Sequence, residues 1–164
     1  MAQPLPALIE ALRETADRLD GGAAYRWTHM GSCNCGHLAQ TVTRLDRVEL
    51  HRRALERSGD WTEQVREYCP SSGLPFDGVI GALLNLGLST GDLADLEKLR
   101  NPKVRARIAR ARGEPSKISH RVRKDVVAYL RAWADLLEEQ AAGGLPRVPS
   151  FGALWHRDPA ASGA

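Results

Sequence analysis

Apolar residues recur at helical spacing along most of this chain, and this periodicity limits the fold more than any other feature. The first stripe has apolar residues three and four positions apart, which places them on one face of a helix: Leu5, Leu8, Ile9, Leu12, Ala16 and Leu19. Similar stripes follow, including a longest one at about 116–140, and no segment alternates as a strand would. We therefore predict an all-α fold, a single compact bundle of six or seven helices.

Breaks between the stripes suggest where the helices end. Gly21 and Gly22 end the first helix, and an irregular loop follows it. Asn101 and Pro102 are a natural N-cap and first residue for a later helix. The 164 residues fit one domain. Residues 141–164 are rich in Gly, Pro and Ala, so we predict a helical domain at 1–140 followed by a flexible tail.

The bulk composition narrows the class of protein. No window approaches the stretch of about eighteen apolar residues that a membrane span needs, so we expect no membrane partner. Charges among the first apolar residues argue against a secretory signal. The chain has three cysteines, an odd number that does not suit an extracellular disulfide framework. We expect a cytoplasmic protein, in which clustered cysteines more often serve metal or redox chemistry.

The loop after the first helix holds a cluster of soft donor atoms in the stretch WTHMGSCNCGHLAQ. His29, Cys33, Cys35 and His37 have the spacing H-x3-C-x-C-x-H. Thiolate sulfur and imidazole nitrogen are the usual ligands of zinc, and they also suit iron, copper and iron–sulfur centres. The loop glycines predict backbone angles that other residues resist. A helix that starts near Gly36 would favour thiolate over thiol at both cysteines.

Two further donors extend this cluster. Cys69 precedes a proline in a turn, and His51 lies on an apolar stripe of a helix at about 47–57, between Val48 and Leu55. The predicted metal ligands are drawn from His29, Cys33, Cys35, His37, His51 and Cys69, with zinc as the favoured metal. The sequence leaves open which histidine completes the site. It also leaves open whether the site is structural, regulatory or catalytic.

Other functions fit the same residues. Cys33 or Cys35 could serve a redox or metal-assisted enzyme as a thiol of low pKa, and the sequence does not decide whether the protein is an enzyme. Buried cysteines can also act as small apolar residues, and His51 can be an ordinary core histidine.

A basic segment supplies a second candidate site. Between residues 98 and 124 there are eleven Lys or Arg residues and one acid, although the net charge of the whole chain is only +3. Five of them cover the polar surface of one predicted short helix: Lys103, Arg105, Arg107, Arg110 and Arg112. Such density attracts nucleic acid, smaller anions or an acidic protein. The segment lacks aromatic residues for base stacking, so a solvated basic face is the alternative.

Three stretches together resemble an uncharacterised family of bacterial proteins: YRWTHMGSCNCGHLAQTVTRL, DWTEQVREYCPSSGLP and VVAYLRAWADLLE. That family shares a Trp-x-His-Met-Gly-x-Cys-Asn-Cys-Gly core and a downstream Tyr-Cys-Pro, and has no known activity. The resemblance covers about residues 4–140. It implies that the residues matching this pattern belong to one shared site: Trp27, His29, Met30, Gly31, Cys33, Asn34, Cys35, Gly36 and Cys69.

Overall fold

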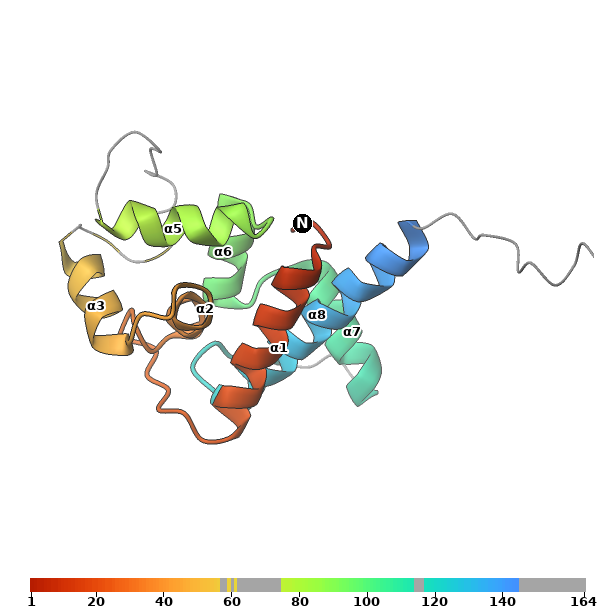
Figure 1. Cartoon of the computed structure of the whole chain (residues 1–164). Helices are drawn as coiled ribbons and strands as arrows, with labels where there is room; N and C mark the ends of the chain where they lie inside the picture. The colour runs from red at the N-terminus through yellow and green to blue at the C-terminus, as the bar shows by residue number, and fades with distance from the viewer. Residues whose placement is uncertain (57–58, 60, 62–74, 114–116, 145–164) are drawn as a thin grey trace, which may run out of the picture.

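The computed structural model of the chain describes residues 1–56, 59, 61, 75–113 and 117–144. These residues are helical and contain no strand, which confirms the predicted all-α fold (Figure 1). The helices are α1 (Pro6–Asp20), α2 (Asn34–Thr43), α3 (Arg47–Leu55), α5 (Pro75–Asn85), α6 (Thr90–Lys98), α7 (Pro102–Arg112) and α8 (Arg123–Gly144). In the described part, no single helix is long and apolar enough to cross a membrane. The segments Gly78–Asn85 and Thr90–Arg112, bent by 99° at the break between them, have sufficient length and apolar content only when they are taken together.

Helices α1 and α8 lie side by side and form the most extensive helix pair, with α7 packed against α8 (Figure 1). The stripe predicted for the first helix faces this contact, because Leu8, Leu12 and Leu19 are fully buried. Tyr129 and Trp133 of α8 are also fully buried, and their rings meet edge to face. This half of the molecule is held by ordinary apolar burial.

Helix α2 connects this pair to the rest of the fold, because it contacts α1, α3, α5 and α6. Its first residue, Asn34, is fully buried and reaches the end of α6. The Asn34 Nδ2 atom donates to the carbonyl oxygens of Leu96 and Glu97, at 2.9 Å each. The Tyr25 hydroxyl contacts Asn34 Oδ1 and the carbonyl oxygen of His120. These contacts hold the start of α2 against α6, and Tyr25 links it to the segment that precedes α8.

Side chains cap several of the described helices, including α7, whose Asn101 cap was predicted. Asn101 caps α7, with its Oδ1 atom accepting from the backbone N–H groups of residues 103 and 104, and Pro102 is the first helical residue. Ser89 and Asp92 cap α6 reciprocally. Asp46 caps α3 with its Oδ1 atom, which accepts from the backbone N–H groups of Val48 and Glu49. These side chains satisfy backbone donors that have no partner within their own helix.

The predicted boundaries of the last helix are wrong at both ends. Helix α8 begins at Arg123 rather than near residue 116. Residues 117–122 are not helical: the Val122 N–H donates to the Ser119 carbonyl, and the Asp125 carboxylate accepts from the Ser119 N–H at 2.9 Å. The helix then continues to Gly144, four residues beyond the predicted end. The rest of the predicted tail, 145–164, lies outside the described residues.

The apolar stripe predicted for α3 is also wrong. Val48 and Leu55 are 65% and 67% exposed, whereas Leu50 and Ala54 on the opposite side are fully buried. The helix therefore packs through Leu50 and Ala54. His51 lies at the edge of the buried face and is half-buried.

Candidate functional site

The loop between α1 and α2 forms consecutive tight turns and packs against the starts of α2 and α3. The Cys33 N–H donates to the His29 carbonyl at 2.9 Å. A Cβ atom on Gly36 would lie 2.1 Å from the Met30 carbonyl oxygen, and one on Gly31 would lie 2.0 Å from the Arg47 carbonyl oxygen. Neither glycine has a positive φ. The expectation of unusual backbone angles is therefore wrong, because close approach of backbone to backbone is what excludes a side chain here.

Cys33 is the N-cap of α2 and is 2% exposed. Its Sγ atom donates to the Met30 carbonyl oxygen at 3.4 Å. Burial raises the pKa of this thiol to about 12, although the backbone N–H groups of Gly36 and Cys35 act in the opposite direction. Burial outweighs the helix terminus, so the expected thiolate is not the form that this conformation favours.

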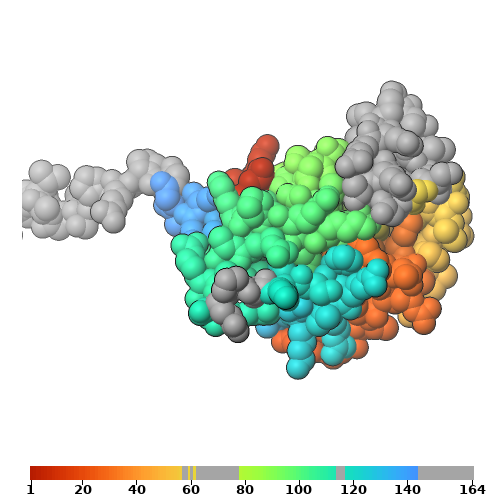
Figure 2. Space-filling view, turned by 180° about the vertical axis from the view of Figure 1, so that it is seen from behind, coloured from red at the N-terminus to blue at the C-terminus, as the bar shows by residue number. Residues whose placement is uncertain are grey.

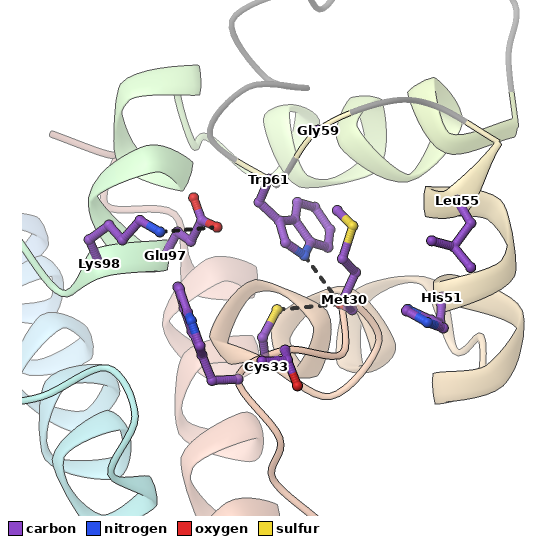
Figure 3. Close-up of a pocket in the computed structure, with 10 residues that line it drawn as sticks. Met30, Cys33, His51, Leu55, Gly59, Trp61, Glu97 and Lys98 are labelled. Atoms are coloured by element: carbon purple, nitrogen blue, oxygen red, sulfur yellow. Dashed lines mark hydrogen bonds and ion pairs between the residues drawn. The ribbon is translucent and has the colours of Figure 1, made fainter.

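A cavity of about 380 Å³ opens next to the Cys33 thiol (Figure 3). It is lined by Trp27, Thr28, Met30, Cys33, His51, Leu55, Gly59, Trp61, Glu97 and Lys98. We call it the Cys33 cavity. Figure 3 shows Glu97 and Lys98 of α6 on one side and His51 of α3 on the other, with Trp61 between them. The Trp61 Nε1 atom donates to the Met30 carbonyl oxygen at 3.2 Å, so the indole is anchored to the loop.

His29 and His51 stack on each other, with ring centroids 3.8 Å apart and planes 23° from parallel. The Nδ1 atom of each ring is buried and has no hydrogen-bond partner among the described residues. Burial and the neighbouring His51 ring lower the pKa of His29. The predicted ligands His29 and His51 are therefore together in space, and His51 shares its cavity with Cys33.

The other predicted ligands lie elsewhere. Cys35 is fully buried, and its Sγ atom donates to the Leu93 carbonyl oxygen of α6 at 3.5 Å. The Nε2 atom of His37 lies 3.1 Å from the Ala24 carbonyl oxygen, and burial lowers the pKa of its imidazole to about 4. Cys69 falls outside the described residues. Across residues 1–56, 59, 61, 75–113 and 117–144, no three His, Cys, Asp or Glu side chains gather closely enough to hold a metal ion.

Sequence reasoning missed the α6 side of the cavity. Glu97 is 3% exposed, and its Oε1 atom lies 3.8 Å from the Lys98 ammonium. The Lys98 ammonium also lies 4.5 Å from the centroid of the Trp27 ring. A Glu-Lys pair at the end of an amphipathic helix usually faces solvent, and nothing in its local pattern signals contact with a loop more than sixty positions earlier.

The basic segment lies on the surface. Residues of α7 and of the segment that follows it, coloured green to cyan, spread over the face in Figure 2. Arg107 contacts Glu139 of α8 at 2.8 Å, and Arg112 contacts Asp125 at 3.1 Å. Arg105 donates to a backbone carbonyl. Part of the predicted phosphate-binding charge is therefore neutralised within the chain. Lys103 and Arg110 remain exposed, without an ion pair in the described part of the structure.

Comparison of the chain with known protein families, curated proteins and solved structures gives no match. The resemblance to the bacterial family with the Cys-Asn-Cys-Gly core stays a prediction.

Proposed function

We propose that this chain is a small metal-binding protein, with the metal held in the Cys33 cavity and zinc as the favoured ion. The observation that carries the proposal is that a thiol and an imidazole face the same cavity. Cys33 and His51 both line it, and the His51 Nδ1 atom has no hydrogen-bond partner within the described residues. A thiol and an imidazole are the donors that zinc prefers.

The surroundings of these two donors support the proposal. An unpartnered buried imidazole nitrogen destabilises the folded state, and a metal ion is one partner that would satisfy it. The buried carboxylate of Glu97 lines the same cavity and adds an oxygen donor. Burial keeps Cys33 protonated in the absence of metal, so zinc binding would release the thiol proton. Trp27 and Trp61 line the cavity and would limit access of water.

Two donors in one cavity are fewer than a zinc site uses, and the described side chains do not form a complete set. The proposal therefore requires that Glu97, or a donor outside the described residues, moves in to complete the coordination. Cys69 is such a donor in the sequence. This requirement favours a structural or regulatory site whose ligands come together when the metal binds. It does not favour a rigid site that exists before binding.

Elemental analysis of the full chain, purified without a metal-affinity step, tests the proposal. We expect about one zinc per chain, because one cavity holds the proposed donors. Cys33→Ser and His51→Ala should each lower the zinc content. Cys35→Ala is the matched control, because its thiol donates to Leu93 in the core and does not line the cavity.

Cobalt(II) replacement adds a direct test of sulfur ligation. We expect a thiolate-to-cobalt absorption band in the wild-type chain and in Cys35→Ala, and no such band in Cys33→Ser. Full retention of metal by Cys33→Ser, or absence of bound metal from the wild-type chain, would contradict the proposal.

The other two functions predicted from the sequence remain alternatives. An enzyme that uses Cys33 needs a reactive thiolate, so alkylation of Cys33 near neutral pH would favour it. Nucleic-acid or acidic-partner binding rests on Lys103, Arg105, Arg107, Arg110 and Arg112. Salt-dependent retention on DNA or RNA that is lost on removal of the exposed Lys103 and Arg110 would favour that function.

A further inference from the structure

A second cavity lies on the other side of the stacked histidines. Its volume is about 410 Å³, and it is lined by Ala24, Tyr25, Arg26, His29, Ser32, Arg47 and Val48. We call it the Arg26 cavity. None of these residues lines the Cys33 cavity. The volume lies within the range of about 300–1,000 Å³ that is usual for small-molecule sites.

Ser32 supplies a buried hydrogen-bonding group at the wall of this cavity. The residue is 2% exposed, and its hydroxyl oxygen has no hydrogen-bond partner in the described part of the chain. Buried hydroxyls are nearly always paired, because leaving one unpaired destabilises the folded state. The Nδ1 atom of His29, which lines the same cavity, is also buried and without a partner there. Two unsatisfied polar groups therefore meet at one cavity.

Two arginines, Arg26 of the loop and Arg47 of α3, line the same cavity, and both residues are exposed. Both act electrostatically on the His29 ring, so their charges lie near the same point. Within the described residues neither guanidinium forms an ion pair or a hydrogen bond, whereas Arg13 and Arg44 are each paired with acids.

Among the described residues, no carboxylate lines the Arg26 cavity. The nearest acid along the chain, Asp46, caps α3 through its Oδ1 atom, which accepts from the backbone N–H groups of Val48 and Glu49 at 2.8 Å each. The two arginines therefore give the cavity a net positive charge that no lining residue offsets.

We infer that the Arg26 cavity binds the phosphate group of a small phosphorylated molecule. Two guanidinium forks from different elements match the charge and the several acceptor oxygens of a phosphate dianion, whereas a carboxylate occupies a single fork. Ser32 provides a further donor. The cavity is larger than a phosphate group alone, so the remainder of the molecule would lie beside Tyr25 and Val48.

Calorimetric titration of the full chain, freed of metal with a chelator, tests this inference. The probes are inorganic phosphate, methyl phosphate and acetate at constant ionic strength. We expect saturable binding of both phosphates and binding of acetate that is weaker by about tenfold, because acetate loses one charge-assisted fork. Arg26→Gln combined with Arg47→Gln should weaken phosphate binding by more than about tenfold.

Arg110→Gln is the control for loss of positive charge, because this arginine is exposed on α7 and does not line the cavity. Ser32→Ala tests the hydroxyl. We expect about fivefold weaker phosphate binding, with a melting temperature in the absence of ligand that is unchanged or raised, since the hydroxyl has no partner to lose in the described part of the chain.

Three results would overturn the inference: no saturable phosphate binding, equal effects of the Arg26/Arg47 pair and of Arg110→Gln, or acetate binding as tight as phosphate binding. The zinc content of the Arg26/Arg47 double variant separates this site from the proposed metal site. Failure of the phosphate titration with zinc retained would remove the Arg26 cavity alone.

Discussion

At the scale of single residues, close backbone contact explains why Gly31 and Gly36 have no side chain, whereas the sequence had predicted unusual backbone angles. A Cβ atom on Gly36 would overlap the Met30 carbonyl, which belongs to the backbone and cannot rotate away. We predict that Gly36→Ala lowers the free energy of unfolding by about 3 kcal/mol or more, measured by urea denaturation. Gly78→Ala is the control, because no atom lies within 4 Å of its Cβ position. Wild-type stability of Gly36→Ala, measured beside a Gly78→Ala control that is not destabilised, would contradict this view of the loop.

His37 should make stability depend on pH. Burial lowers the pKa of its imidazole from 6.5 to about 4, so the unfolded chain binds a proton between these values and the folded chain does not. The stabilisation is complete above about pH 6.5 and is lost as the pH falls through 4, by up to about 3 kcal/mol. Urea denaturation at a series of pH values should show a smaller loss in His37→Gln, whose amide does not titrate. Identical pH profiles for the two proteins would exclude His37 as the cause.

The Cys-x-Cys motif shows how much a residue pattern can reveal about this site. Two of the predicted ligands, Cys33 and His51, line the same cavity. The sequence also grouped Cys35 with Cys33, although two positions on a helix are about 200° apart. Cys33 therefore faces the cavity while Cys35 faces Leu93 in the core. The motif spacing predicted shared chemistry, and the start of α2 separates the two thiols.

At the scale of elements, Asn34 joins the start of α2 to the end of α6. Its amide donates to the carbonyl oxygens of Leu96 and Glu97 in the last turn of α6. We predict that Asn34→Ala lowers the free energy of unfolding by about 2 kcal/mol and speeds hydrogen exchange in the last turn of α6. Wild-type exchange in α6 together with wild-type stability would show that this link is unimportant.

Helix boundaries were predictable where their chemistry is local. The Asn101 cap and the glycine that ends α1 act through neighbouring backbone groups, and both are confirmed. The start of α8 was missed because the apolar spacing continues unbroken through residues 118–122. The turn there depends on the Asp125 side chain and on the contact of Tyr25 with the His120 carbonyl, which the spacing does not encode. The prediction of the buried face of α3 was wrong for a related reason. The helices that pack against α3 decide which of its apolar side chains are buried, and its own sequence does not.

At the scale of the whole molecule, α1 contacts both α8 and α2, so the two halves of the fold should unfold together. Leu12 is fully buried on α1. We predict that Leu12→Ala lowers the free energy of unfolding by about 3 kcal/mol and that helical circular dichroism and tryptophan fluorescence follow one shared transition. Fluorescence and circular dichroism that separate into two transitions would instead show that the loop half unfolds independently.

The imidazoles of His29 and His51 stack on each other, and His29 lines the Arg26 cavity while His51 lines the Cys33 cavity. A ligand that rotates either ring changes the surface offered to the other ligand, with no shift of a helix. If zinc on one side raises the affinity for a phosphate ester on the other, the ester must raise the affinity for zinc by the same factor, because the two equilibria form one thermodynamic cycle. The form with both ligands bound would then be favoured over either singly bound form, so the protein would respond most strongly when both solutes are present.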